Sequence, residues 1–286
     1  MNPAIDDNFA DAVFHSLRCK IEDPALLALS LTLPPETTLA QDMGIIDPDS
    51  LHKARQLVKS QLAQKNKDAF MELFLGNQEK GEYLLTAEAM GKRSLKNVSL
   101  AYLMALDPLP QEHLVLCVQQ YRSATNMTDC IAALTNLVNL DHEIRQEVLD
   151  DFYSKWVGDP LVLDKWFTLQ ALSVLPNTLK NVALLADSPS FSIENPNKVR
   201  ALIGAFCANN HVRFHEKNGA GYTFLADKIL ELNIINPQIA ARLVAPLINW
   251  KRYDLKRQEL MRGQLERIVG AQDLSRDVYE IVDKSR

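Results

Sequence analysis

The placement of the prolines constrains the fold of this chain more than any other sequence feature. Of the 13 prolines, those at positions 3, 24, 48, 108, 160, 196 and 237 follow an aspartate or an asparagine. An Asp or Asn side chain accepts a hydrogen bond from an unpaired amide at a helix start, and proline suits the first helical position because it has no N–H to satisfy. Each dipeptide therefore predicts a helix start, with a plain turn as the alternative, and roughly two thirds of them are expected to open helices.

Apolar residues recur at helical spacing after several of these positions. The stripes are Leu51, Ala54, Val58 and Leu62; Tyr222, Leu225, Ile229 and Leu232; Ile239, Leu243 and Leu247; and Met261, Leu265, Ile268 and Val269. No segment alternates with period two, as a strand would. Because the intervals between helix starts vary and no pattern repeats at a fixed period, the sequence predicts an all-α fold: an irregular α-superhelix (HEAT/ARM-like) of about a dozen antiparallel helices. We expect one domain over residues 1–286, with a candidate subdomain seam at 186–197.

Composition excludes several classes of protein. An apolar fraction of 47% and a net charge of −5 disfavour disorder, and the acidic balance disfavours nucleic acid as the main partner. No apolar stretch is long enough to span a bilayer, and the first residues do not resemble an export signal. The cysteines at 19, 117, 130 and 207 form no CxxC pair. We therefore expect a cytoplasmic protein with reduced, buried thiols and no membrane partner.

Patterns of catalytic residues are missing. The sequence has no HExxH, no GxSxG and no P-loop, so no catalytic residue is predicted. Cys207, His211 and His215 have the spacing of four that would place them on one helix face if the helix continued. Asn209 and Asn210 are expected to end that helix, so no metal site is predicted.

Positive charge gathers near the end of the chain. Between Arg242 and Arg267 there are seven basic residues against three acidic ones. A solvated helix face with ion pairs four residues apart explains this bias, and the alternative is a positive wall that faces an anionic or carboxylate-bearing ligand. Gln238 and Arg242 favour the second interpretation slightly, because they lie four apart and therefore on one face.

Several longer runs resemble the C-terminal end of the bacterial aminopeptidase N family. The densest runs are Asn195-Pro-Asn-Lys-Val-Arg-Ala-Leu-Ile-Gly-Ala-Phe206, Phe214-His215, Gly219-Ala-Gly-Tyr222, Asn236-Pro-Gln-Ile-Ala-Ala-Arg-Leu243 and Lys251-Arg-Tyr-Asp-Leu-Lys-Arg-Gln258. Upstream, Asn126-Met-Thr-Asp129 and Asp164-Lys-Trp-Phe167 are similar to the same family. The resemblance extends back to about Ile21 and keeps the order of the segments.

This resemblance implies a role in a larger enzyme. Members of the family are zinc exopeptidases that release the N-terminal residue of peptides, and a helical C-terminal domain closes over their catalytic domain. The matching positions imply that Arg200, Gln238 and Arg242 line the enclosed substrate chamber and position the peptide. The expected partners are the catalytic domain and peptide substrates, and the zinc cofactor belongs to that catalytic domain. The chain alone is expected to hold no cofactor and to be inactive.

Other interpretations stay open at this point. Each of these three side chains could instead tie helices together by capping carbonyl groups. A free-standing α-solenoid that binds a protein or peptide would have the same composition and helix pairing. A separate metallohydrolase built on Cys207, His211 and His215 is the third alternative.

Overall fold

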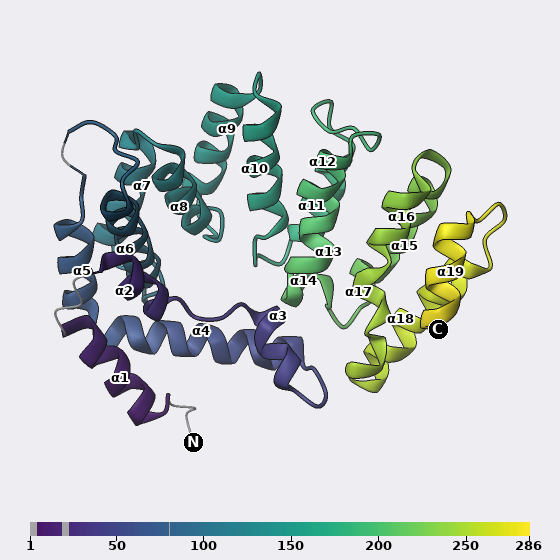
Figure 1. The fold of residues 1–286 in the computed structure, drawn as a ribbon, viewed down its shortest axis with the longest axis horizontal. Helices are drawn as coiled ribbons and strands as arrows, with labels where there is room; N and C mark the ends of the chain where they lie inside the picture. The colour runs from purple at the N-terminus through teal and green to yellow at the C-terminus, as the bar shows by residue number, and fades with distance from the viewer. Residues whose placement is uncertain (1–4, 19–22, 80) are drawn as a thin grey trace. The chain divides into compact units, whose positions relative to one another are not determined.

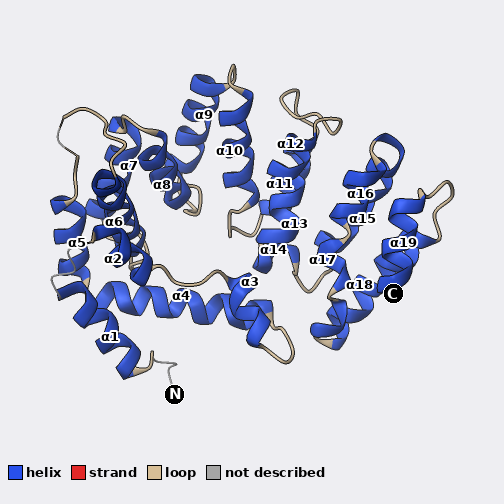
Figure 2. Ribbon diagram, in the orientation of Figure 1, coloured by secondary structure: helices blue, strands red, loops and turns tan. Residues whose placement is uncertain are grey.

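The computed structural model describes residues 5–18, 23–79 and 81–286. These residues form helices joined by short loops (Figures 1 and 2). Within the described ranges the β-structure is limited to an isolated bridge between Ile46 and Tyr253. The all-α prediction is therefore confirmed.

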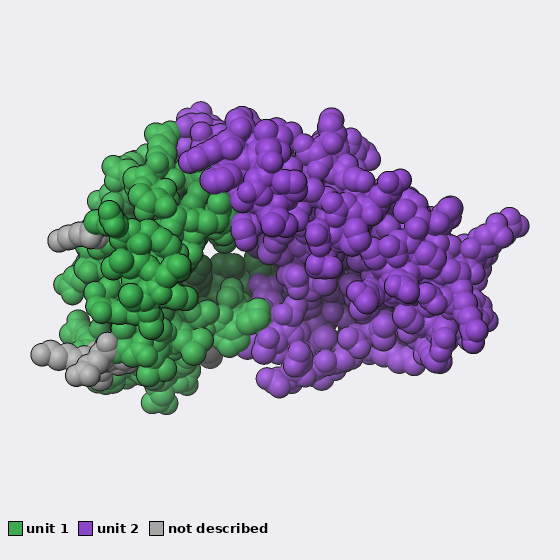
Figure 3. Space-filling model, turned by 45° about the horizontal axis from the view of Figure 1, so that its top comes forward, with its two compact units in different colours: residues 1–35, 52–140 green, residues 36–51, 141–286 purple. Residues whose placement is uncertain are grey.

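Two compact units make up the chain (Figure 3). Unit 1 contains residues 1–35 and 52–140, and unit 2 contains residues 36–51 and 141–286. The segment 186–197, where the sequence suggested a seam, lies inside unit 2. The boundaries between the units fall after residue 35, within the helix that begins at Pro48, and after residue 140.

Unit 1 is built from helices that pack around an aromatic and aliphatic core. Its helices are α1 (Asp7–Arg18), α2 (Pro24–Leu31), α4 (Pro48–Lys65, from residue 52), α5 (Lys67–Gly76), α6 (Ala87–Leu103), α7 (Gln111–Ser123) and α8 (Met127–Leu137). Phe70 of α5 stacks on Tyr102 of α6 with ring centroids 4.3 Å apart. A buried ion pair at 2.6 Å between Lys96 and Asp129 links α6 to α8.

Unit 2 continues with shorter and more interrupted helices. Its elements are α3 (Glu36–Leu39), η1 (Ala40–Asp42), α9 (Ile144–Trp156), α10 (Pro160–Ala171), α11 (Thr178–Ala186), α12 (Pro196–Val199), η2 (Arg200–Gly204), α13 (Ala205–Asn209), α14 (His211–Phe214), α15 (Ala220–Ile235), α16 (Pro237–Leu243), α17 (Ala245–Ile248), η3 (Trp250–Arg252), α18 (Leu255–Val269) and α19 (Arg276–Ser285). Neighbours such as α9 and α10 run in opposite directions (Figure 1). The helices outnumber the predicted dozen because several runs are divided into pieces of four to seven residues.

The predicted stripes of α15 and α18 lie largely in the core of unit 2, whereas Ile239 and Leu243 of the third stripe are half-buried and line a cavity. In α15, Tyr222, Leu225 and Ile229 are fully buried, and in α18 Met261 and Leu265 are fully buried as well. Burial of such side chains contributes roughly 1.5–3 kcal/mol each, which is the main source of stability for helices this short.

The Asp/Asn-Pro prediction holds at most of the described positions. Helices begin at the prolines at 24, 48, 160, 196 and 237. Asp107-Pro108 is a cis peptide bond in a loop, so this dipeptide forms the alternative turn. Pro3 lies outside the described residues. In all five helices the side chain of the preceding residue caps the helix start; Asp159, for example, accepts from the amide of Leu161 at 3.0 Å.

The structure also bears on the expectations about the cysteines and about membrane-spanning helices. Cys117 and Cys207 are buried thiols, as expected, whereas Cys130 is half-buried and Cys19 lies outside the described residues. Among the helices that are described, none has the length and apolar character needed to cross a membrane.

Candidate functional site

Arg200 is held at a change of helix type. α12 begins at Pro196, and the Asn195 side chain accepts a hydrogen bond from the Asn197 amide at 2.9 Å. The π-helical segment η2 then starts at Arg200 and ends at Gly204. A π-turn widens the helix by one residue per turn and is frequent at functional sites. The side chain of Arg200 is exposed at the start of this turn.

Lys198 anchors the same segment to α10. Its ammonium group donates to Asp164 at 2.7 Å and to the carbonyl of Pro160 at 3.0 Å, and the lysine is buried. The Thr168 hydroxyl adds a hydrogen bond to the carbonyl of Ala201 at 3.0 Å. Because these contacts fix the backbone on both sides of Arg200, its guanidinium is presented from a rigid base.

Gln238 and Arg242 lie one turn apart on α16. The helix starts at Pro237, and the Asn236 side chain accepts a hydrogen bond from the amide of Ile239 at 3.2 Å. Both Gln238 and Arg242 are exposed, as their spacing of four on the polar face predicts.

Arg200 and Arg242 line one cavity of about 300 Å³ in unit 2. Its apolar wall includes Val199, Ile239 and Leu243, and no acidic residue lines it among the described part of the chain. In that part of the chain, Arg242 has neither a hydrogen-bond nor an ion-pair partner. The cavity therefore combines apolar walls with two arginines and has no acidic residue in its own described lining.

Gln238 lines a separate hollow on the other side of Arg242. This hollow has a volume of about 510 Å³ and is also lined by Asp277, Glu280 and Lys284 of α19. Two of the three predicted residues, Arg200 and Arg242, thus line one cavity. The third, Gln238, lines the neighbouring hollow, which Arg242 also lines. Since two carboxylates lie beside Gln238, its amide is suited to a neutral peptide group rather than to a carboxylate.

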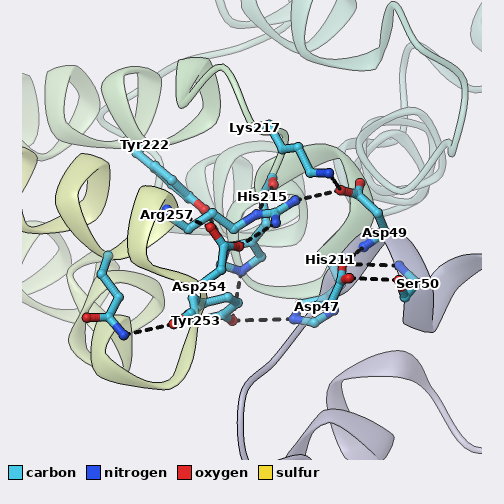
Figure 4. A network of polar contacts seen from close by, with 11 residues as sticks. Asp47, Asp49, Ser50, His211, His215, Lys217, Tyr222, Tyr253, Asp254 and Arg257 are labelled. Carbon is cyan, nitrogen blue, oxygen red and sulfur yellow. Dashed lines mark hydrogen bonds and ion pairs between the residues drawn. The ribbon is translucent and has the colours of Figure 1, made fainter.

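Unit 2 also contains a network of polar contacts centred on a buried arginine (Figure 4). Arg257 of α18 is 1% exposed and donates to the carbonyl of His215 at 2.7 Å, to Asp254 at 2.6 Å and to Asp49 at 2.9 Å. Lys217 approaches the same Asp49 oxygen at 3.4 Å. Arg257 therefore fastens α18 to the loop after α14 and to the start of α4.

Sequence reasoning missed this network. Asp254 caps α18 by accepting from the Arg257 amide at 3.1 Å, which the spacing of three could have suggested. Asp49 lies 208 positions before Arg257, and no local pattern connects them.

His211 and His215 are held neutral by their surroundings. Burial lowers the pKa of His215 well below its usual value, and the neighbouring His211 and Arg257 lower it further. Burial also lowers the pKa of His211, and Arg257 adds to this effect while Glu36 opposes it. Both imidazoles therefore act as neutral hydrogen-bonding groups at physiological pH.

Cys207, His211 and His215 do not form a metal centre in the described part of the chain, where no cluster of three His, Cys, Asp or Glu side chains suits a metal ion. Both ring nitrogens of His215 are occupied by the hydroxyls of Tyr222 and Tyr253, at 2.9 and 3.0 Å. Burial raises the pKa of the Cys207 thiol well above its usual value, which disfavours the thiolate that a metal needs.

The basic stretch from Arg242 to Arg267 separates into residues with different contacts. Arg262 pairs with Glu266 at 3.2 Å four residues on, and Arg267 pairs with Asp227 across to α15. Arg257 is buried in the network of Figure 4. The ion-pair interpretation therefore holds for several of these arginines. Arg242 lines a cavity, and its role toward an anionic ligand stays a prediction.

A family model described as "Domain of unknown function (DUF3458_C) ARM repeats" matches residues 1–286. The HEAT/ARM-like expectation agrees with this description. Curated relatives carry the name aminopeptidase N: the Escherichia coli K12 protein is 41% identical over 265 residues, and the Caulobacter vibrioides protein is 40% identical over 280 residues. These alignments cover 92% and 98% of this chain but only 30% and 32% of the relatives, in their C-terminal part.

A solved structure is also similar over nearly the whole chain. It is Legionella pneumophila aminopeptidase A in complex with aspartic acid, with a TM-score of 0.88 and 30% sequence identity. The match covers 99% of this chain and 34% of that protein. The chain therefore spans about a third of the length of each of these proteins.

Proposed function

The chain belongs to the ARM-repeat family described as DUF3458_C, and we propose that it acts as the C-terminal domain of a zinc-dependent aminopeptidase N. In this role it caps the catalytic domain, encloses the substrate chamber and helps to position the peptide beyond the scissile bond. Its partners are the catalytic domain and peptide substrates.

The cavity shared by Arg200 and Arg242 is the observation that carries this proposal. Both guanidinium groups come from exposed positions on separate helices, and no acidic residue among the described ones lines the cavity beside them. Carboxylates and carbonyl oxygens are the peptide groups that such a site attracts, and arginine binds a carboxylate through two parallel hydrogen bonds. The apolar wall gives space to a side chain of the bound peptide.

The three predicted residues then have distinct roles. Arg200 and Arg242 bind the terminal carboxylate or a carbonyl oxygen of a peptide that extends past the scissile bond. Gln238, beside Asp277 and Glu280, hydrogen-bonds a peptide amide or carbonyl. These are positioning roles, which raise the rate by fixing the substrate in a reactive orientation.

Zinc chemistry in this proposal belongs to the catalytic domain. The described residues offer no cluster that fits a metal ion. A zinc ion held elsewhere would activate the attacking water, and the residues of this chain would orient the peptide toward it.

Replacing Arg242 by alanine is expected to impair peptides more than small amides. In the aminopeptidase that carries this chain, Arg242→Ala should lower kcat/KM for tri- and tetrapeptides by roughly 10- to 100-fold, because one charge-assisted hydrogen bond is lost. Amino-acid amides do not reach past the scissile bond, so their kcat/KM should change little. Steady-state kinetics on both substrate classes measures the difference.

Arg262→Ala is the matched control, since Arg262 is an exposed arginine that lies on α18 and pairs with Glu266. It should leave both substrate classes unchanged. Equal losses on peptides and amides in Arg242→Ala, at unchanged thermal stability, would show that Arg242 does not position the peptide.

The coding sequence around this chain offers a separate test of the parent enzyme. A zinc aminopeptidase requires an HExxH segment upstream in the same reading frame. Its absence would favour the free-standing peptide-binding solenoid.

A further inference from the structure

A small cavity of about 150 Å³ lies wholly within unit 1, whereas Arg200 and Arg242 belong to unit 2. α4 contributes Arg55 and Lys59 to its wall, and these two residues lie four apart and therefore on one face of the helix. The rest of the wall is mostly apolar and is formed by Leu31, Thr32, Leu33, Val98, Ala101 and Tyr102. The proposed function uses none of these residues, so the cavity needs its own explanation.

The described wall of this cavity carries positive charge and no negative charge. No acidic residue among the described ones lines it. Tyr102 donates its hydroxyl to the carbonyl of Leu31 at 2.8 Å, and burial raises the pKa of Tyr102 to about 12, so the hydroxyl stays neutral. The charge that acts on Lys59 is that of Arg55, a second cation.

Arg55 is fixed at the wall with part of its guanidinium unused. Its Nε atom donates to the carbonyl of Pro34 at 2.8 Å, and its Nη2 atom donates to the carbonyl of Leu33 at 3.2 Å. In the described structure its Nη1 atom has no hydrogen-bond partner. Nη1 is also not among the unpartnered polar atoms that lack accessible surface, so it can be reached by a ligand in the cavity.

Lys59 has a free and reactive amine. In the described structure its Nζ atom forms neither a hydrogen bond nor an ion pair, and it keeps accessible surface. Burial is the larger cause and the charge of Arg55 adds to it; together they lower the pKa of Lys59 to about 8. A substantial fraction of this amine is therefore unprotonated near neutral pH, with a lone pair that can attack an electrophile.

We propose that Lys59 is a carbamylation site, at which the amine adds CO₂ and the guanidinium of Arg55 holds the carbamate that forms. The Nζ lone pair makes a bond to the carbon of CO₂, and the electron pair of one C–O π bond moves onto oxygen. The proton that the nitrogen then loses goes to water. One neutral amine and one CO₂ thus give one carbamate anion and one proton, and no further reactant is needed.

The size and charge of the cavity favour CO₂ over other electrophiles. A mostly apolar space of about 150 Å³ suits a molecule as small and apolar as CO₂. An acetyl group or an imine on Lys59 would leave Arg55 without an anion. A carbamate instead supplies oxygens that accept hydrogen bonds from Nη1 of Arg55 and neutralise its charge.

Chemical trapping in the full-length protein that carries this chain tests the proposal. The protein is equilibrated at about pH 8 with carbon-13-labelled bicarbonate and CO₂ and then treated with triethyloxonium, which converts a carbamate into a stable ethyl carbamate. Mass spectrometry of the digested protein should locate the labelled adduct on Lys59. An ordinary lysine has a pKa of about 10.4, so exposed lysines such as Lys53 of α4 should carry far less of it.

A peptide with a free α-amino group in the same mixture is the positive control, because its pKa of about 7.7–8.0 also leaves the amine free to react. Absence of the adduct from Lys59 while this peptide is trapped would overturn the proposal. Equal trapping on Lys59 and Lys53 would overturn it as well.

Variants assign the two roles. Lys59→Met should abolish the adduct at this position and should still fold, because it removes a buried charge that has no partner. Lys53→Met is the matched control on the same helix and should leave the Lys59 adduct unchanged. Arg55→Gln should lower the amount trapped on Lys59 by about tenfold, since one charge-assisted hydrogen bond to the carbamate is lost.

Unchanged trapping in a folded Arg55→Gln protein would contradict the role of Arg55. If this variant fails to fold, the comparison of Lys59 with Lys53 in the unaltered protein decides the proposal. Arg242→Ala should leave the adduct unchanged, so the result does not depend on the proposed function.

Discussion

Arg257→Met is expected to lower the free energy of unfolding by about 3 kcal/mol or more. Arg257 is 1% exposed, and its guanidinium serves one carbonyl and two carboxylates, those of Asp49 and Asp254. Methionine fills a similar volume but leaves these acceptors without their cation. Breaking a buried ion pair from one side typically costs about 3–5 kcal/mol, and the partial exposure of both carboxylates places the expected loss at the lower end.

The pH dependence of this loss provides a second readout. Burial is the largest single influence and raises the pKa of Asp254, but the side-chain and backbone hydrogen bonds and the charge of Arg257 together outweigh it and hold the pKa below its usual value. A carboxyl group with a lowered pKa contributes stability above its unfolded pKa, and this stability is lost as the pH falls through the folded pKa. The difference between the two proteins should therefore shrink between pH 7 and pH 3, as urea unfolding followed by circular dichroism can measure.

The control is Arg262→Met on the same helix. Arg262 is more than half exposed and, among the described residues, pairs only with Glu266, so its replacement should change the free energy of unfolding by about 0.5 kcal/mol or less. A similar loss of stability in the two variants would contradict the claim that the buried contacts of Arg257 stabilise the fold more than the exposed ion pair of Arg262 does.

Gly221→Ala is expected to destabilise the chain by a comparable amount. A β-carbon at Gly221 would lie 2.3 Å from the carbonyl oxygen of Phe214 and 3.1 Å from two further backbone atoms of that residue. Because the obstacle is backbone, α15 and α14 must move apart, and overpacking of this kind costs about 3 kcal/mol or more. The thermal midpoint and the urea midpoint should both fall.

Gly263→Ala provides a control with the opposite sign. Gly263 lies inside α18, and a β-carbon there meets no atom within 4 Å. Alanine in an exposed helix interior is favoured over glycine by about 0.5–1 kcal/mol, so this variant should be slightly more stable. Destabilisation by Gly263→Ala, or tolerance of Gly221→Ala, would contradict the packing described here.

Helix starts could be predicted from the sequence because their causes are local. A capping side chain and the proline after it act within one turn, as at Asp159 and Pro160. The prediction that Asn209 and Asn210 end a helix is confirmed in the same way, since α13 ends at Asn209 and Asn210 caps α14. Likewise, Gly219 adopts a left-handed conformation with φ 73° and opens α15.

Contacts between distant segments could not be predicted in this way. The arginine–carboxylate contact between Arg257 and Asp49 and the hydrogen bonds of His215 to two tyrosines depend on packing of segments up to 208 residues apart. Arg200 and Arg242 were named from a family resemblance, and their spacing alone gave no reason to place them together. Their shared cavity exists because η2 and α16 pack near α13 and α17.

The central claim is that Arg200 and Arg242 act together on a peptide that extends past the scissile bond. A double-mutant cycle measures this directly: kcat/KM of Arg200→Ala, Arg242→Ala and the double variant, in the aminopeptidase that carries the chain, on a tetrapeptide with a free carboxylate and on an amino-acid amide. We expect large losses on the tetrapeptide, a combined loss smaller than the sum of the single losses by about 1 kcal/mol, and little change on the amide. Strictly additive losses that are equal on both substrates would contradict the account.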